Sequence, residues 1–160
     1  MIAVVYFSRD NNTKAGAEFL AASLEGTLVS LVEEKRSSFM GGAWKALRGK
    51  PVKLKGEPWQ EVQAVENIYL MTPIWANNGA PAINEFLLKT DFSGKKVTII
   101  TFQADASFKG SELAHQTIAA LIEKKGGMVL ACHACHGARP GAFAGKEYIE
   151  RQVAQVTLQQ

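Results

Sequence analysis

Short apolar runs alternate with segments of helical periodicity along most of the chain. Five of these runs have the length and the branched side chains that are typical of buried strands. The expected strands cover residues 2–7, 27–32, 68–72, 97–102 and 128–132. Apolar side chains recur three or four positions apart, as on one face of a helix, at residues 17–24, 83–87, 114–122 and 149–156. This alternation predicts an α/β fold with a doubly wound parallel sheet.

The first expected strand, residues 2–7, runs directly into a polar loop and then into an alanine-rich helical segment. In such an arrangement the N–H groups of the loop and of the helix N-terminus point toward one spot, where the helix dipole favours negative charge. Hydroxyl and amide groups can hydrogen-bond a phosphate monoester there. The candidate phosphate-binding residues are Ser8, Arg9, Asp10, Asn11, Asn12 and Thr13. An ordinary polar loop is the alternative that this motif leaves open.

This loop, residues 8–13, resembles the phosphate loop of flavodoxin-like proteins, which often reads Ser-Arg-Thr-Gly-Asn-Thr. The resemblance implies FMN as the cofactor and a three-layer, doubly wound, five-stranded parallel sheet with strand order 2-1-3-4-5. Asn11 replaces the family's glycine, and asparagine tolerates positive φ well. Asp10 replaces a threonine, and a carboxylate that faces a phosphate repels it. Asp10 therefore points to solvent, or the site binds FMN weakly, or it binds another ligand.

A loop with one large aromatic residue follows the third expected strand, residues 68–72. It resembles the family loop that flanks the isoalloxazine ring of FMN, with a proline, a hydrophobic residue, a tryptophan and then small residues. The resemblance implies that Trp75 packs on the ring and that the backbone of residues 77–79 reorients between redox states. A tryptophan that only packs under the loop is the alternative. The candidate residues are Pro73, Ile74, Trp75, Ala76, Asn77, Asn78 and Gly79.

The loop after the fourth expected strand, residues 97–102, takes the place of the family loop that holds the other side of the ring. Thr101 matches the family pattern, whereas Gln103, Ala104 and Asp105 stand where glycines are usual. Phe108 is either a stacking partner of the ring or the anchor of the next helix. The candidate cofactor-binding residues here are Thr101, Phe102, Gln103, Ala104 and Phe108.

Residues 132–136 read Cys-His-Ala-Cys-His and contain the Cys-x-x-Cys-His pattern of c-type haem attachment. The same side chains could bind a metal or form a redox dithiol. Adjacent residues of a strand point to opposite faces, so at most part of this set converges on one site. The favoured interpretation is a strand end with reduced thiols, and we predict no metal site.

Charge is distributed unevenly along the 160 residues, whose formal net charge is +3. Between residues 35 and 56 the chain has no acidic side chain and seven basic ones, and the rest of the chain is net acidic. These basic residues are Lys35, Arg36, Lys45, Arg48, Lys50, Lys53 and Lys55. We expect one domain, residues 1–160, with a basic helical insert around residues 35–58.

Apolar residues recur at helical spacing inside the insert, at residues 39, 40, 43, 44 and 47. The favoured interpretation is a helix that packs its apolar face on the core and exposes its basic face. A basic face also suits an acidic protein or a nicotinamide nucleotide. No nucleic-acid-binding motif is present.

Two classes of function fit these features. The first is an FMN-binding redox protein that carries electrons between proteins, or an NAD(P)H-dependent FMN oxidoreductase that reduces a small acceptor of quinone or flavin type. No side chain is assigned a catalytic role, because the hydride or electron chemistry belongs to the cofactor. The second is a cofactor-free module of the same fold that docks an acidic partner through its basic insert.

The expected partner of the redox protein is therefore a redox protein or a nicotinamide nucleotide. An exposed apolar face on the insert would favour a homodimer. No apolar run approaches the ~20 residues of a membrane span, and no basic leader precedes the first strand. We therefore expect a cytoplasmic protein without membrane contact.

Overall fold

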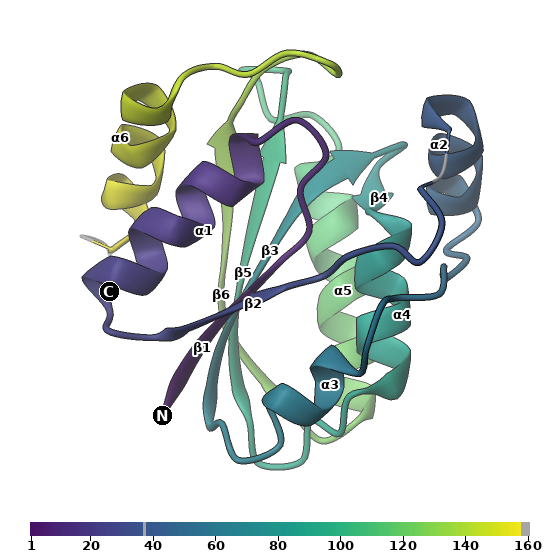
Figure 1. Cartoon of the computed structure of the whole chain (residues 1–160), viewed down its shortest axis with the longest axis vertical. Coiled ribbons are helices and arrows are strands. Elements are labelled where there is room, and N and C mark those ends of the chain that lie inside the picture. Colours follow the sequence, from purple (N-terminus) through teal and green to yellow (C-terminus); the bar gives the residue numbers. More distant parts are fainter. Residues whose placement is uncertain (37, 158–160) are drawn as a thin grey trace.

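Parallel strands form the centre of the computed structural model, which describes residues 1–36 and 38–157, and helices cover both faces of the sheet (Figure 1). The parallel strands are β1 (Ile2–Tyr6), β2 (Thr27–Ser30), β3 (Asn67–Trp75), β5 (Lys96–Gln103) and β6 (Met128–His136). They lie in the order β2-β1-β3-β5-β6, and the short β4 (Asn78–Gly79) pairs antiparallel with β3. With β4 set aside this is the order 2-1-3-4-5, so the predicted topology of the five parallel strands is confirmed.

The helices lie in two layers (Figure 1). One face of the sheet carries α1 (Asn12–Ser23) and α6 (Lys146–Thr157), which pack against each other. The opposite face carries α3 (Pro58–Glu61), α4 (Pro81–Lys89) and α5 (Ser111–Lys124). The remaining helix, α2 (Phe39–Leu47), lies beside the β3–β4 end of that second face. No helix within the described ranges is long and apolar enough to cross a membrane.

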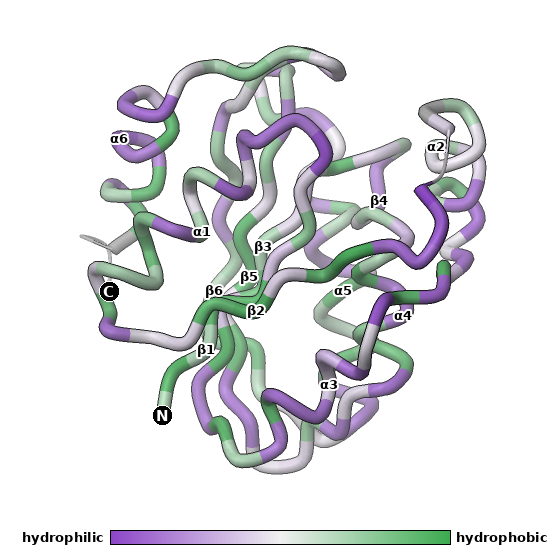
Figure 2. Tube along the Cα trace, viewed as in Figure 1, coloured by the Kyte–Doolittle hydropathy of each residue, from purple (hydrophilic) through white to green (hydrophobic). Residues whose placement is uncertain are grey.

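The central strands are apolar on both sides, as buried parallel strands usually are. In and just after β1, Ala3, Val5 and Phe7 join the core beneath α3, α4 and α5. Val4 and Tyr6 join the second core, beneath α1 and α6. The apolar colour of the central strands in Figure 2 follows from this two-sided burial. Continuous apolar runs in the sequence therefore marked the central strands well.

Two strands extend further than their apolar runs suggested. β3 continues to Trp75 and β6 to His136, four residues beyond the predicted end at residue 132. The cause is pairing with a neighbour, because β5 and β6 stay in register as far as Gln103 opposite His136. Backbone hydrogen bonds thus hold polar residues in a strand that side-chain preference alone would end earlier.

The basic insert contains two helices, α2 and α3, and an isolated antiparallel bridge between Glu33 and Leu54. The helix predicted in the insert is present, but its inner side is formed by Gly42 and Ala46. A Cβ on Gly42 would lie only 2.8 Å from Cζ3 of Trp75, so the small residues let α2 approach the tip of β3. Three of the five apolar side chains expected to pack inward are exposed instead: Met40, Trp44 and Leu47. Ala43 is half-buried, and the side chain of Phe39 lies outside the described part of the structure.

The prediction of a single domain, residues 1–160, includes residues 37 and 158–160, which lie outside the described residues. Within the described ranges, two core clusters lie on the two faces of one continuous sheet. A single domain therefore stays the interpretation that this arrangement favours.

Candidate functional site

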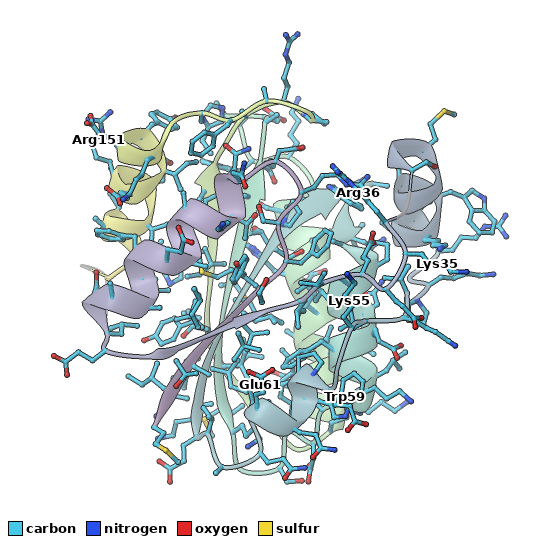
Figure 3. All side chains as sticks on the ribbon, viewed as in Figure 1. Lys35, Arg36, Lys55, Trp59, Glu61 and Arg151 are labelled. Atoms are coloured by element: carbon cyan, nitrogen blue, oxygen red, sulfur yellow. The ribbon has the colours of Figure 1, made fainter. Side chains whose placement is uncertain are left out.

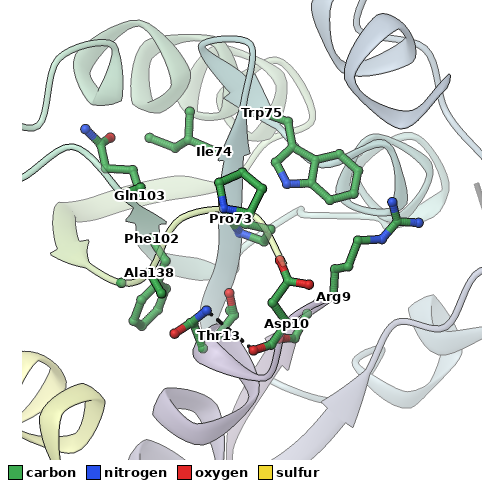
Figure 4. Close-up of a pocket in the computed structure, with 14 residues that line it drawn as sticks. Arg9, Asp10, Thr13, Pro73, Ile74, Trp75, Phe102, Gln103 and Ala138 are labelled. Atoms are coloured by element: carbon green, nitrogen blue, oxygen red, sulfur yellow. Dashed lines mark hydrogen bonds between the residues drawn. The ribbon is translucent and has the colours of Figure 1, made fainter. Parts of the chain in front are cut away.

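A pocket of about 130 Å³ lies at the carboxyl ends of β1, β3, β5 and β6 (Figure 4). In an open parallel sheet, ligands bind outside the carboxyl ends of the strands, where the strand order reverses. The reversal lies between β1 and β3, because the chain goes from β1 to β2 on one side and from β3 to β5 on the other. The lining residues are Ser8, Arg9, Asp10, Asn12, Thr13, Pro73, Ile74, Trp75, Phe102, Gln103, Ala104, Gly137, Ala138 and Pro140.

The loop between β1 and α1 forms one side of this pocket. Asn11 ends the loop at φ 65°, which confirms the expected left-handed backbone, and α1 begins at Asn12. The helix N-terminus is therefore at the pocket, and no acidic side chain occupies its first turn. Within the described part of the chain, the buried Oγ of Ser8 has no hydrogen-bond partner. A buried hydroxyl without a partner beside a helix N-terminus fits an anionic ligand that accepts its hydrogen bond.

Arg9 forms the wall at the other end of the loop. Its Nη2 lies 3.9 Å from Oε2 of Glu33, and both side chains are more than nine-tenths buried. Its guanidinium carbon lies 5.1 Å from the ring centroid of Trp75, within the range of a cation–π interaction. Arg9 is thus fixed between an acid and an aromatic ring, and its charge is partly balanced by Glu33.

Trp75 is held at the tip of β3 by contacts on several sides. Its ring meets that of Phe7 edge to face, with 5.7 Å between centroids, in addition to its contact with Arg9. The turn after it places Ala76 at φ 48° and Asn77 at φ 61°, a conformation that favours hairpin turns. Trp75 therefore lines the pocket on a strand end whose geometry is tightly determined.

The predicted flexible stretch, residues 77–79, differs from the observed hairpin. Residues 76–79 do not line the pocket, and the positive-φ turn lies at Ala76 and Asn77. Asn78 and Gly79 form β4, and Gly79 is buried against Ile118. The positive φ values of Ala76 and Asn77 define this turn. The reorientation of residues 77–79 between redox states stays a prediction.

The loop after β5 supplies the third side of the pocket through Phe102, Gln103 and Ala104. The Nε2 of Gln103 donates to the carbonyls of Asp105 and Lys109, each at 3.2 Å. Its Oε1 is buried without a partner within the described part of the chain, so it is an acceptor suited to an N–H group of a ligand. Gln103 thus both shapes its loop and offers a hydrogen-bonding group at the pocket.

Thr101 and Phe108, predicted for the same loop, lie outside the pocket lining. Thr101 is fully buried, and its Oγ1 lies 2.8 Å from Nε2 of His115 on α5. Burial lowers the pKa of His115, so this ring is neutral near pH 7. Phe108 is at φ 56° and its carbonyl accepts from the Ser111 hydroxyl at 2.8 Å. The Phe108 carbonyl thus contacts the start of α5, and the role of the Phe108 ring stays a prediction.

The segment at residues 137–145, here called the strap, was missed by the sequence analysis. Gly137, Ala138 and Pro140 line the pocket. The Asn12 side chain holds the strap on both sides: Nδ2 donates to the Ala142 carbonyl at 2.8 Å, and Oδ1 accepts from the Ala144 N–H at 2.9 Å. Only the abundance of glycine and small residues in this stretch hinted at such a close approach.

The strap also changes the interpretation of two predicted phosphate ligands. Oδ2 of Asp10 accepts the N–H of Gly141 at 2.9 Å, so this carboxylate is tied to the strap beside the pocket. Both polar atoms of the Asn12 side-chain amide hydrogen-bond to the backbone of the strap. A phosphate in the pocket would therefore meet the backbone N–H of Asn12 and the hydroxyls of Ser8 and Thr13.

The Cys-x-x-Cys-His stretch is part of β6, and its two thiols are on opposite faces of the strand. Cys132 is exposed, whereas Cys135 is buried against the α1–α6 core. Burial raises the pKa of Cys135 to about 12 and also raises that of Cys132, to which the Glu123 carboxylate adds. Within the described ranges no group of three or more metal-binding side chains is present. This geometry does not support haem attachment, a shared metal or a dithiol.

His136, at the end of this stretch, links the β5 loop to α6. Its Nε2 lies 3.1 Å from the Ala104 carbonyl, and its Nδ1 lies 2.5 Å from the Tyr148 hydroxyl. A carbonyl only accepts, so Nε2 donates to Ala104, and Nδ1 pairs with the Tyr148 hydroxyl. This side chain therefore positions Ala104 at the pocket edge.

The chain matches no protein-family model and no curated protein sequence. Solved structures are similar at low identity. A flavoprotein in complex with FMN from Lactobacillus acidophilus has TM-score 0.67 and 14% identity, covering 83% of this chain and 91% of that one. The Trp repressor binding protein from Bacillus subtilis has TM-score 0.70 and 15% identity, covering 98% and 97%. Two-electron reduced flavodoxin from Megasphaera elsdenii has TM-score 0.57 and 16% identity, covering 97% and 99%. The chain therefore has the flavodoxin-like fold that the resemblance implied.

The role of Asn12 in holding the strap leads to a first prediction. Asn12→Ala leaves the Ala142 carbonyl and the Ala144 N–H without their partner, at a local cost of about 1–3 kcal/mol. We expect the Ala144 amide to exchange with solvent about tenfold faster or more in hydrogen-exchange measurements. Asn12→Asp keeps the acceptor for Ala144 and is the matched control, with an intermediate effect. Unchanged exchange in Asn12→Ala would show that other contacts hold the strap.

Proposed function

We propose that this protein binds FMN in the pocket at the carboxyl ends of β1, β3 and β5 and is a flavodoxin-like redox protein. The observation that carries the proposal is the pair of buried polar atoms without partners, Ser8 Oγ and Gln103 Oε1, on opposite loops of one pocket. One is a hydroxyl beside a helix N-terminus, and the other is an amide oxygen beside Phe102. A ligand with a phosphate at one end and N–H groups at the other satisfies both.

The phosphate end of the proposed ligand is held by the β1–α1 loop. Ser8 and Thr13 offer hydroxyls, and the backbone N–H groups at the start of α1 offer further donors. The buried Arg9 side chain adds positive potential at the rim, reduced by its pairing with Glu33. Hydrogen bonds to a charged acceptor of this kind contribute more than neutral ones.

The ring end of the proposed ligand lies between the β3 and β5 loops. Trp75, Ile74 and Phe102 supply apolar surface, and Gln103 supplies the acceptor. The pocket is smaller than the roughly 300–1,000 Å³ of sites that enclose a whole ligand, so part of the ring extends into solvent. When bound, FMN supplies the electron or hydride chemistry. The protein binds the ring, orients it and leaves an edge open to a redox partner.

We propose two roles for the bound flavin. The protein carries electrons between proteins, or it is an NAD(P)H-dependent oxidoreductase that reduces a small acceptor of quinone or flavin type. An open ring edge suits a redox protein as well as a nicotinamide nucleotide, so this proposal includes both partners. A cytoplasmic location follows from such partners as part of the same proposal.

A cofactor-free docking module is the second candidate, and the insert favours it. Met40, Trp44 and Leu47 expose one apolar stripe of α2, and Arg48 lies 4.4 Å over the Trp44 ring. An apolar stripe with cationic neighbours suits an acidic partner, or a second copy of the chain in a homodimer. Flavin binding separates the two candidates, because the docking module needs no ligand in the pocket.

A titration of FMN, followed by quenching of flavin fluorescence, tests the proposed function. We expect the wild-type protein to bind FMN and Trp75→Ala to bind it about tenfold more weakly or worse, because the ring loses its aromatic neighbour. Trp44→Ala is the matched control, since Trp44 is exposed on α2 outside the pocket. If the two variants bind FMN equally, Trp75 is not a contact of the ring. If the wild type binds no FMN, the docking module becomes the favoured function.

The charge of Asp10 generates a separate prediction. Asp10→Asn keeps an oxygen that can accept the Gly141 N–H and removes the carboxylate charge beside the phosphate. We expect FMN affinity to rise about tenfold, because the repulsion between the two anions is lost. Asp105→Asn removes the same charge from a loop residue outside the pocket lining and is the control. Equal or weaker binding by Asp10→Asn would contradict this placement of the phosphate.

A further inference from the structure

A second cleft, of about 470 Å³, lies on the other side of Arg9 from the flavin pocket. It is formed by the β1–α1 loop, by the segment that follows β2, and by the strand-like segment that bridges back at Leu54. The cleft lining is Tyr6, Phe7, Ser8, Arg9, Asn11, Lys14, Ser30, Leu31, Val32, Glu33, Glu34, Arg36 and Lys55. Its position at the carboxyl ends of β1 and β2 is again one where open parallel sheets bind ligands.

The cleft has a cationic rim built from separate parts of the chain. Arg36 and Lys55 belong to the insert, and Lys14 belongs to the first turns of α1, where it also pairs with Glu18 at 3.8 Å. Figure 3 shows Arg36 and Lys55 on the inner side of the insert, whereas Lys35 points away from the body. Two cations from opposite ends of one insert thus face a common space.

The acids of the cleft do not cancel this rim. Glu33 is buried and paired with Arg9, so these two charges largely neutralise each other. Glu34 is exposed, and its single negative charge is outnumbered by the three cations of the rim, Lys14, Arg36 and Lys55. A net positive cleft attracts an anion, and guanidinium and ammonium groups are the usual donors to phosphate oxygens.

The size and the walls of the cleft indicate more than an inorganic ion. Its volume is within the roughly 300–1,000 Å³ typical of small-molecule sites, and far exceeds that of a single phosphate. Val32 is 45% exposed and gives the cleft an apolar surface, whereas Phe7 and Leu31 are buried in the core. An exposed apolar side chain suits the face of a base, and the exposed carboxylate of Glu34 suits the hydroxyls of a ribose.

We propose that this cleft binds a nucleotide that carries a phosphate monoester. Arg36 and Lys55 hold the phosphate, Glu34 accepts from the ribose hydroxyls, and the base packs on Val32. The site is separate from the proposed FMN pocket, because the buried Arg9 side chain stands between them. The proposal needs no flavin, and it therefore goes beyond the proposed function.

Isothermal titration calorimetry with adenosine 2′,5′-bisphosphate tests this site in the flavin-free protein and again with saturating FMN. We expect one bound nucleotide in both forms, and adenosine without phosphate should bind about tenfold more weakly or worse. Displacement of the nucleotide by FMN would overturn the proposal, because the phosphate would then occupy the β1–α1 loop. Should FMN fail to bind at all, the proposed function fails, and binding to the flavin-free protein still decides this inference.

Variants of the rim locate the bound nucleotide. Arg36→Ala and Lys55→Ala should each weaken binding about tenfold, as the loss of one cation–phosphate contact predicts. Lys35→Ala and Lys53→Ala are the matched controls: each removes a cation next to or near the rim residues but outside the cleft lining. We expect the controls to bind within about twofold of wild type. Equal losses in all four variants would mean nonspecific attraction by the basic insert and would overturn the proposal.

Discussion

The loop that follows β1 is the feature on which both candidate sites depend. The chain goes from β1 to β2 on one side and from β3 to β5 on the other, so the strand order reverses between β1 and β3. The β1–α1 loop lies at this reversal, where open parallel sheets bind ligands. The flavin pocket lies on the β3 side of this loop and the second cleft lies on the β2 side. Arg9 separates them, fixed by Glu33 on one side and by Trp75 on the other.

Distant segments complete the pocket that the β1–α1 loop begins. The strap reaches the loop through Asn12 and Asp10, more than 125 residues away along the chain. It covers part of the loop with the backbone of small residues, which can approach closely where larger side chains could not. His136 and Trp75 then hold the neighbouring loops in place. The same strap uses the side chains of Asn12 and Asp10, so the phosphate donors that remain are mainly backbone N–H groups and hydroxyls.

The parts of the fold that depend on local pattern were predictable, and the parts that depend on distant pairing were not. The apolar runs marked β1 and β5, and the positive φ of Asn11 agrees with its place where the family has glycine. The end of β6 at His136 depends on pairing with β5, and the strap depends on Asn12, so neither is visible locally. The outward stripe of α2 was missed because Gly42 packs against Trp75, a contact that helical periodicity does not encode. Among the site residues, Thr101 and Phe108 were placed by loop position. The Thr101 hydroxyl lies beside His115, and Phe108 lies outside the pocket lining.

The most direct test of the account compares the affinities of FMN and riboflavin for the wild-type protein. The two ligands share the ring and differ in the phosphate, so their ratio measures the contribution of the β1–α1 loop. The account predicts that FMN binds about tenfold more tightly or better, because the Ser8 hydroxyl and the start of α1 donate to the phosphate. Equal affinities would contradict the phosphate cradle, and the absence of binding by both ligands would contradict the proposed function.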